Sequence, residues 1–549
     1  MTTVKVPIKV PKLSGFDKSH HNALTQKVGT IVPILVDELI PKSKVNLRFA
    51  LAGSFPPLAV DTYMKCYYDV RAFFVPMRLL SGGFESFFSD YPYNVIASGT
   101  PKNQVSSSKS YLPVLSIDIA TANTAKIFGA GTLTDYLGYK DQSQTISTPD
   151  ETVKISAMPL LAYHRVCNDW FRQSNITREY FARPDNGNYP VISVSGKYAM
   201  AMQPFVSATD ITRATFPVVS AYNDDCVLLA DGTSIFELRQ ANYDYDYFTN
   251  ALPSAQLGNP MTVASASSFT IPALRIANSL QQFSELNMLA GSDFVSAVKA
   301  RYGANLSRGV AQRCIYLGGS RIDIGSKSVE VNADNNSNAN PFANLVGASA
   351  GKAYCQGTDL IVDGFVADEP GYLFVVGVVI PKVTYGSGVR RYLRHYISAG
   401  SITDMANHLL QNVGNQPIYD WELTASLGDS SYSAGVFGYT DRYAEFMTME
   451  DEVHGLMVDG QSLGAFVAQR TFNYSDTPVI SSNFLSISPW ALDNITAVSS
   501  QIGNYGFYGQ FAFDYKVCQP LAQYSLPSLQ NPAYEHGNTV MVHRGGFRF

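Results

Sequence analysis

The stretch YMKCYYDVRAFFVP, residues 63–76, decides the fold class. Apolar and small side chains alternate along it with polar ones, and this period of two is typical of a β-strand with one buried face. The apolar face carries Met64, Cys66, Tyr68, Val70, Ala72 and Phe74, and the opposite face carries Lys65, Asp69 and Arg71. A strand of 14 residues is long against the usual five or six, and such a length suits a large sandwich or barrel.

A second stretch of the same kind, GNYGFYGQFAFDYKV, lies at residues 503–517. Its apolar face carries Tyr505, Phe507, Phe511, Phe513, Tyr515 and Val517. Helical periodicity is rarer: it predicts one amphipathic helix over 158–173 and a helical region over 272–302 that is interrupted near Gly291. Stretches rich in Gly, Ser, Asn and Pro at about 97–155, 185–240 and 325–360 predict long inserted loops. The pattern therefore predicts an all-β domain with long insertions and a few short helices.

The composition agrees with strands joined by many turns. Of 549 residues, 46% are hydrophobic and 12% aromatic, with 41 Gly and 28 Pro, and the net charge of only −5 excludes a disordered chain. Charged residues make up 15%, against about 25% in an average soluble domain. Low charge with 33 Tyr fits either a surface covered by protein partners or simply a large core, and composition leaves both open.

Cysteine spacing and hydropathy exclude several kinds of site. The six cysteines, at 66, 167, 226, 314, 355 and 518, form no CxxC pair and lie near no His at metal-ligand spacing. No signal peptide precedes the first strand, and the longest apolar stretch, YLFVVGVVIPKV at 372–383, is too short to cross a membrane. We therefore expect a protein made in a cytoplasm, with reduced cysteines and no membrane partner.

Both ends of the chain are basic. Residues 1–27 carry five Lys against one Asp, a net charge of +4, and the chain ends in HRGGFRF. We divide it into an N-terminal arm (1–27), a single domain (28–520) and a C-terminal arm (521–549). The cationic side chains at issue are Lys5, Lys9, Lys12, Lys18, His20, His21, Arg544 and Arg548. Such ends fit contact with a polyanion or ordinary solvated termini.

A basic and aromatic cluster occupies residues 390–396. It consists of Arg390, Arg391, Arg394 and His395, interleaved with Tyr392 and Tyr396. Arg beside Tyr can hold single-stranded nucleic acid by pairing with phosphate and stacking on bases. We favour the alternative, an ion-pair site between subunits, and predict that charge reversal at the three arginines impairs assembly more than folding.

One catalytic motif occurs, GQSLG at 460–464, which matches GxSxG and would make Ser462 the nucleophile of a hydrolase. Roughly 0.3 such matches arise by chance in a chain of this composition, and the motif needs a strand, a sharp turn and a helix of a parallel α/β sheet. A calcium-loop pattern that begins at Asp334 fails at its sixth and twelfth positions. The adjacent carboxylates at 450–452 predict a solvated edge. We expect no catalytic residue, no metal site and no cofactor.

Six stretches, in this order, carry a resemblance to a known family. They are FDKSHHNALTQKVGTIVPILVDELIPKSKVNLRFALAGSF (16–55), MKCYYDVRAFFVPMRLLSGGFESFF (64–88), MPLLAYHRVCNDWFRQSN (158–175), YDYFTNALPSAQLG (245–258), RYGANLSRGVAQRCIYLGGSRIDI (301–324) and FGYTDRYAEF (437–446). They resemble the major capsid proteins of Microviridae, small tailless phages with circular single-stranded DNA, and most closely those of the gokushovirus type. The likeness runs from about residue 16 to 530.

The resemblance implies a viral jelly roll of eight antiparallel strands, expanded by loops, with sixty copies in a T=1 shell. It implies no enzymatic activity. The implied partners are further copies of the chain, packaged single-stranded DNA, an internal scaffolding protein, a small basic DNA-binding protein and a DNA pilot protein. The two basic arms would face inward onto DNA phosphates. Attachment to an unknown host receptor through surface loops is a separate expectation, which the resemblance does not supply because the chain is divergent. The protein would belong to the virion and be assembled in the cytoplasm of a bacterial host.

Two features depart from this family. Only residues 258–269 stand where relatives carry a long insertion that builds a protrusion at the threefold axes, and the stretch 185–240 is longer than in relatives. The chain therefore resembles a divergent branch. Two rivals from other classes stay open, a carbohydrate-binding jelly roll that acts as a monomer or small oligomer, and a serine hydrolase using Ser462.

Overall fold

The computed structural model describes residues 13–63, 65–80, 84, 88, 114–118, 129–139, 152–173, 176–177, 179–180, 193–194, 197–199, 227–229, 233–255, 271–290, 294–307, 312–330, 349–395, 406–409, 411, 414–424, 435–472, 478–497 and 506–521. Most of the loops predicted at 97–155 and 185–240 lie outside these ranges, as do the short segment at 258–269 and nearly all of the C-terminal arm.

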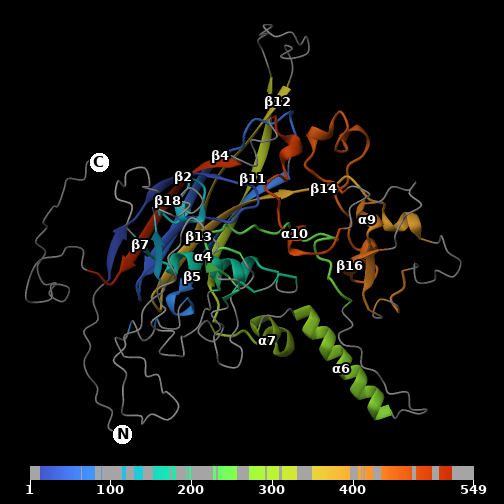
Figure 1. Ribbon diagram of the computed structural model, residues 1–549, viewed down its shortest axis with the longest axis horizontal. Helices are drawn as coiled ribbons and strands as arrows, with labels where there is room; N and C mark the ends of the chain where they lie inside the picture. Colours follow the sequence, from blue (N-terminus) through green and yellow to red (C-terminus); the bar gives the residue numbers. More distant parts are fainter. Residues whose placement is uncertain are drawn as a thin grey trace, which may run out of the picture.

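Long antiparallel strands build the centre of the molecule (Figure 1). They are β1 (Ser14–Asp17), β2 (His20–Gln26), β3 (Val32–Leu39), β4 (Lys44–Ser54), β5 (Lys65–Pro76), β11 (Ile315–Glu330), β12 (Ser349–Val366), β13 (Gly371–Lys382) and β18 (Phe507–Gln519). Because β1 and β2 pair with successive parts of β18, they form one bent strand, and the sheet has eight strands in effect. Their order is β1/β2, β18, β4, β12, β11, β5, β13, β3.

This strand order is that of a jelly roll. When the eight strands are numbered along the chain, one half of the sheet reads 1-8-3-6 (β1/β2, β18, β4, β12) and the other reads 2-7-4-5 (β3, β13, β5, β11). β11 joins the halves, because its first part pairs with β5 and its last part, from Gly325 on, pairs with β12. Two interlocked Greek keys give this order. The prediction of an all-β jelly roll with few helices is confirmed.

The two halves of the sheet pack their apolar faces together. Alternate residues of β18 are buried, as the period of two predicts, and β5 is buried on both faces from Ala72 on. Aromatic rings fill the space between the halves: the ring of Tyr68 lies 5.1 Å from that of Phe507 and 5.6 Å from that of Phe511. Rings of this size contribute much of the apolar area that stabilises the domain.

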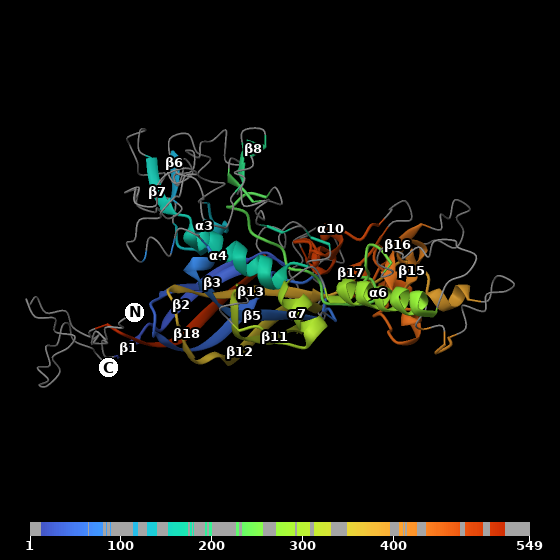
Figure 2. The same ribbon diagram turned by 90° about the horizontal axis from the view of Figure 1, so that it is seen from below.

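The predicted helices are present. α4 (Met158–Val166) continues into a π-helical turn (Cys167–Phe171), and α6 (Ile271–Ala290) is followed by α7 (Phe294–Tyr302). α4 lies over the outer face of β5 and β13 (Figure 2), where the ring of Trp170 in the π-helical turn is 5.7 Å from that of Phe73. This cover explains why the second half of β5 has no exposed face.

Two long connections hold the remaining elements. The connection from β5 to β11 contains α4, α6 and α7 together with α3 (Leu133–Tyr136), β6 (Val114–Asp118), β7 (Thr152–Ser156), β8 (Ser193–Val194), β9 (Lys197–Ala199) and β10 (Val227–Leu228). The connection from β13 to β18 contains β14 (Thr384–Tyr385), β15 (Gln416–Tyr419), α9 (Trp421–Thr424), β16 (Val436–Thr440), β17 (Gln469–Arg470) and α10 (Ser482–Leu485). Apolar residues of the described parts of 385–485 pack with residues 247–251 around a second apolar core, which includes Phe248, Ile418, Phe437 and Phe484. We call this part the side lobe.

The loop predicted at 325–360 is shorter than expected. Its beginning, up to Glu330, belongs to β11 and its end, from Ser349, belongs to β12, so residues 331–348 alone separate the two strands. Gly and Ser are poor strand formers by themselves. Here the ladders from β11 to β12 and from β12 to β4 supply the backbone hydrogen bonds that keep these residues extended.

Two further observations concern membrane-spanning segments and cysteines. No described helix is both long and apolar enough to span a membrane. Five of the six cysteines fall within the described ranges, and these five are free thiols, of which only Cys518 is exposed.

Candidate functional site

The described part of the N-terminal arm belongs to the sheet. β1 and β2 occupy residues 14–26, so the sheet begins at Ser14, within the segment that we divided off as an arm. Ser14 pairs with Gln519 at the other end of the chain. The described ends of the chain therefore lie on neighbouring strands at the same end of the sheet. Lys5, Lys9, Lys12, Arg544 and Arg548 lie outside the described residues.

The three described candidates of this arm differ in their surroundings. The ammonium of Lys18, in the bend between β1 and β2, lies 2.7 Å from the carboxylate of Asp37 in β3. This ion pair connects the bend to β3. The imidazole of His20 lies 5.2 Å from the ring of Phe513, measured between centroids. His21 is exposed on the outer face of β2. Lys18 thus has a structural role in this chain, whereas His21 is accessible to a ligand.

The basic cluster at 390–396 is brought together with carboxylates of the same side lobe. Arg391 Nη1 lies 3.3 Å from Glu422 Oε1 and donates to the carbonyl of Pro417 at 2.6 Å, while Nε lies 3.6 Å from Glu445 Oε1. Glu422 is buried, and burial raises the pKa of its carboxyl although Arg391 opposes the shift. These contacts place Arg391 in an ion pair within the chain.

Arg390, Tyr392 and Arg394 are more exposed than Arg391. Arg390 pairs with Glu452, and the guanidinium of Arg394 lies 4.9 Å from the centroid of the Trp421 ring. Tyr392 is exposed, and Tyr396 lies outside the described residues. Gly388, at a φ of +101°, allows this segment to approach α9, because a Cβ there would lie 2.1 Å from the carbonyl oxygen of Glu422. Tyr392 and Arg394 are therefore the members that a neighbouring molecule can reach.

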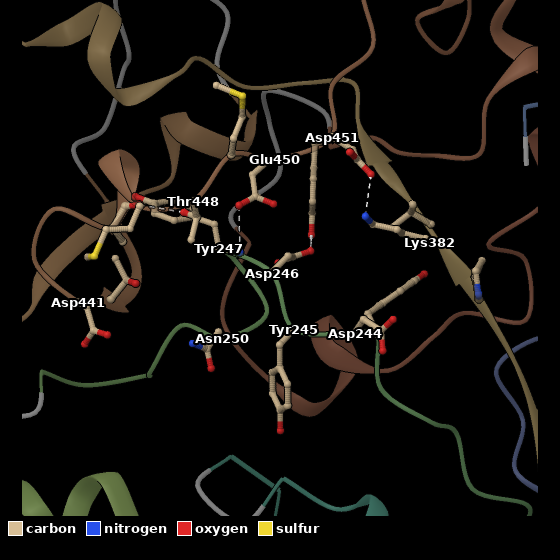
Figure 3. A pocket seen from close by; sticks show the side chains of 18 residues that line it. Asp244, Tyr245, Asp246, Tyr247, Asn250, Lys382, Asp441, Thr448, Glu450 and Asp451 are labelled. Atoms are coloured by element: carbon tan, nitrogen blue, oxygen red, sulfur yellow. Dashed lines mark hydrogen bonds and ion pairs between the residues drawn. The ribbon is translucent and has the colours of Figure 1, made fainter. Parts of the chain in front are cut away.

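Two adjoining hollows mark the surface of the side lobe. One, of about 450 Å³, is lined by the arginine cluster, with Arg390, Arg391, Tyr392, Glu422 and Glu445 among its residues. The other, of about 520 Å³, is shown in Figure 3, and we call it the acidic groove. Its carboxylates are Asp244, Asp246, Asp441, Glu450 and Asp451, and its cation is Lys382.

Hydrogen bonds fix the carboxylates at the centre of the acidic groove. Glu450 Oε1 accepts from the backbone N–H of Tyr247 at 3.1 Å, and Asp246 accepts from the hydroxyl of Tyr385 at 2.7 Å (Figure 3). Burial and the neighbouring carboxylate of Asp246 raise the pKa of Glu450 to about 7. Asp451 differs: against the effect of burial, Lys382 and Lys65 lower its pKa. The solvated edge predicted at 450–452 is therefore wrong: the three residues are half-buried, Glu450 accepts from the backbone of Tyr247, and Asp451 and Glu452 form ion pairs with Lys382 and Arg390.

The raised pKa of Glu450 predicts a pH effect on stability. Between its ordinary value of 4.5 and about 7 the folded chain binds more protons than the unfolded chain, so the free energy of unfolding falls as pH rises through this window. Glu450→Gln keeps an oxygen that can accept from Tyr247 but cannot ionise. Urea midpoints at pH 5, 6, 7 and 8 should decline less for the variant than for the parent chain, and the variant should be the more stable at pH 8. Parallel pH profiles would contradict the assignment.

The structure around Ser462 does not provide a nucleophile elbow. Residues 455–457 and 464–466 are 3₁₀ turns on either side of the serine. The parallel pairing nearby is the two-residue ladder of β14 with β17, which is not the α/β sheet that the motif requires. Within the described ranges, no group of His, Cys, Asp or Glu has the arrangement of a metal site. The calcium-like pattern at 334–345 lies outside those ranges.

Sequence reasoning missed one surface feature, the exposed apolar side chains. Along α6 these are Ile271, Leu274, Ile276, Leu280 and Phe283, and around the acidic groove they are Tyr245, Phe446, Met447 and Met449. The helical period predicts that α6 has an apolar stripe, but a period cannot say what covers the stripe. The one available signal was the low charge of the chain.

Known proteins similar to this chain agree with its fold. Residues 5–529 match a family of phage proteins described as capsid protein (F protein). The chain is 25% identical over 617 residues to capsid protein VP1 of Chlamydia phage 1, covering 96% of this chain and 97% of that protein. It is 22% identical to capsid protein VP1 of Bdellovibrio phage phiMH2K (94% and 95% covered) and 20% identical to that of Spiroplasma virus 4 (93% and 94% covered). Since the match spans almost the whole sequence and the strands follow a jelly-roll order, the chain belongs to the capsid protein (F protein) family of small phages, whose members are structural proteins of the virion.

Proposed function

We propose that this chain is the major capsid protein of a small tailless phage and that sixty copies close into a T=1 shell around circular single-stranded DNA. The observation that carries the proposal is the family match over residues 5–529. The jelly-roll strand order supports it, since this fold recurs in viral capsids. So does the charge content of 15%, because interface cores contain few Lys, Glu and Asp.

The proposed partners follow from the same family resemblance. They are further copies of the chain, an internal scaffolding protein, a small basic DNA-binding protein and a DNA pilot protein, with assembly in the host cytoplasm. Loops on the outer surface would attach to a host receptor. Tyr392 and Arg394 are proposed contacts between subunits, because both are exposed beside the hollow that the arginine cluster lines.

The basic arms are proposed to face the packaged DNA. Support comes from the pairing of Ser14 with Gln519, which lets both arms leave the domain together. The outer face of β2, β18 and β4 next to them is exposed and displays His21, Lys44, Arg48 and Lys516 along with Asp514. A surface of this kind binds phosphate without regard to sequence.

Removal of the arm charges gives a measurable effect. In the triple variant Lys5→Ala, Lys9→Ala and Lys12→Ala we expect the slope of log affinity for single-stranded DNA against log salt to fall by about 2, because each phosphate contact adds about 0.7 for a single strand. The measurement is a titration with a fluorescent oligonucleotide at several salt concentrations. The control is the triple variant Lys299→Ala, Lys327→Ala and Lys352→Ala, which removes the same charge from exposed positions outside the arms and outside the surface proposed to face DNA; it should keep the slope of the parent chain. If both variants show the same slope as the parent chain, the arms do not contact DNA.

Sedimentation of native particles tests the shell itself. We expect the chain to travel with nuclease-protected single-stranded DNA in particles whose protein mass is about 3.6 MDa, sixty copies of a 60.0-kDa chain. A chain that stays near 60 kDa and protects no DNA, even when co-expressed with the neighbouring phage genes, would contradict the proposal. A carbohydrate-binding monomer would likewise sediment as a single chain and protect no DNA.

A further inference from the structure

Helix α6 is unusually exposed for an apolar helix. Figure 1 shows it projecting away from the sheets, and among the described elements α7 is its main packing partner. Ile276 is 60% exposed and Phe283 is 47% exposed. Ile276, Leu280 and Phe283 lie at positions i, i+4 and i+7, and therefore on one face of the helix. Its 20 residues include a single Arg and a single Glu. Most helical stability in proteins comes from tertiary packing of an apolar face. Arg301 of α7 covers part of this face, since its guanidinium lies 5.0 Å from the centroid of the Phe283 ring, and the exposed parts of Ile276 and Phe283 are accessible to a partner.

The acidic groove has an apolar rim of matching character. Tyr245, Met447 and Met449 line it and are 74%, 58% and 80% exposed. Met side chains are flexible and adapt to irregular apolar surfaces, so Met-rich grooves suit the docking of an amphipathic helix. Exposed apolar patches of this kind mark contact sites on soluble proteins.

The charges of the two surfaces are complementary. Helices α6 and α7 carry three cations and one carboxylate, so their net charge is +2. The cations are Arg275, Lys299 and Arg301, and the carboxylate is Glu285. The groove has five carboxylates. Its cations are Lys382 in the lining, Lys65 on Asp451 and Arg321 on Asp244. Because the pKa of Glu450 is raised to about 7, the groove keeps an excess of one negative charge when Glu450 is protonated and of two when it is ionised. Opposite charge across a contact fixes register and disfavours wrong partners.

We propose that α6 of one copy docks into the acidic groove of a neighbouring copy, with Ile276, Leu280 and Phe283 against Met447 and Met449. The inference rests on the proposed function, since it specifies one interface of the shell. The contact joins different surfaces of identical chains, and a rotation that repeats such a contact closes a ring. The groove of each copy therefore receives a helix while its own α6 enters the next copy.

A charge on the apolar face of α6 tests the interface. In the co-expression system that yields native particles, Ile276→Glu should lower the particle yield about tenfold or more, because the interface would bury an unpaired carboxylate. Circular dichroism of the dissociated chain should stay unchanged, since Ile276 is exposed in the single chain. Asn278→Glu is the control: it adds the same charge on the opposite, exposed side of α6 and should leave the yield unchanged. Normal yield from Ile276→Glu would overturn the inference while leaving the proposed shell intact.

Cross-linking identifies the occupant of the groove. In a background of Cys226→Ser and Cys518→Ser, particles with Ile276→Cys and Met449→Cys are treated with a short bis-maleimide. We expect a ladder of covalent oligomers from the double variant and only monomers from either single variant. Dimers from Ile276→Cys alone would show α6 paired with α6, and a cross-link within one chain would show docking on its own groove. Either result, or the absence of cross-links in sedimenting particles, overturns the inference. Failure of the parent chain to sediment with DNA would instead refute the proposed function.

Discussion

Arg391→Glu is expected to unfold the side lobe. The change removes the partner of the buried carboxylate of Glu422 and places a third carboxylate beside Glu422 and Glu445. Breaking a buried ion pair by removing one partner costs about 3–5 kcal/mol, and the added repulsion acts in the same direction. Hydrogen exchange of the amides in β15, α9 and β16 should therefore accelerate strongly, while exchange in β5 and β18 stays slow.

Arg394→Glu is the matched control for this prediction. It introduces the same charge three residues away, where the side chain is exposed and lies over the ring of Trp421. Loss of one such exposed contact costs about 0.5–1 kcal/mol, so the side lobe should remain folded. If Arg391→Glu leaves exchange unchanged and lowers only the particle yield, the ion pair within the chain is not what stabilises this region.

Arg391→Glu and Arg394→Glu distinguish a role in folding from a role in assembly, which the sequence alone could not do. The cluster at 390–396 predicted an ion-pair site between subunits, and charge reversal of all three arginines was expected to impair assembly more than folding. The spacing of the arginines says nothing about Glu422 and Glu445, which reach them only through the packing of α9 and a 3₁₀ turn around the second core. With those carboxylates in the same chain, we expect Arg391 to act on folding, and the assembly effect to come from Arg394.

The sequence predicts those strands in which apolar and polar side chains alternate. β18 and the first half of β5 alternate apolar and polar side chains because one face of each lies in the core, and that alternation is local information. β11 and β12 contain Gly and Ser where the prediction placed a loop. They are extended because the end of β11 pairs with β12 and β12 pairs with β4. β4 lies far away in the sequence, so this pairing leaves no local signal.

The acidic groove could not be predicted for the same reason. Asp246 lies in the connection from β5 to β11 and Glu450 in the connection from β13 to β18, and the fold alone brings the two carboxylates to one hollow. The pKa of Glu450 depends on that meeting and on burial. In the sequence, Glu450, Asp451 and Glu452 are simply three adjacent acidic residues, and such residues are usually exposed to solvent.

Gln26→Leu is expected to destabilise the jelly roll where its two halves close. Gln26 is 1% exposed, and its Nε2 donates to the carbonyls of Thr30 at 2.7 Å and Gly377 at 2.8 Å. Its Oε1 accepts from the hydroxyl of Tyr68 at 2.6 Å. The leucine has similar volume but leaves three polar groups without this partner. A buried polar group left unpaired costs about 1–3 kcal/mol, so we expect a loss of at least about 3 kcal/mol in urea unfolding of the dissociated chain.

A double-mutant cycle isolates the contribution of this network. Tyr68→Phe removes one donor and leaves Gln26 Oε1 unpaired, at a cost of about 1–2 kcal/mol. When both changes are combined, the hydroxyl is already absent, so the double variant should lose less than the sum of the single losses. The geometry requires Gly377, since a Cβ there would lie 2.2 Å from the hydroxyl of Tyr68.

Gln510→Leu supplies the surface reference for this cycle. Gln510 is exposed on β18, opposite Ala23 of β2, and its replacement should change stability by no more than about 0.5 kcal/mol. If Gln26→Leu costs no more than Gln510→Leu, the apolar core alone holds β2 against β13 and the buried glutamine is not needed. If it costs several times more, a polar contact between residues 351 positions apart fixes the closure of the two halves, because an apolar interface by itself would tolerate a shift of β2 along β13 that these hydrogen bonds forbid.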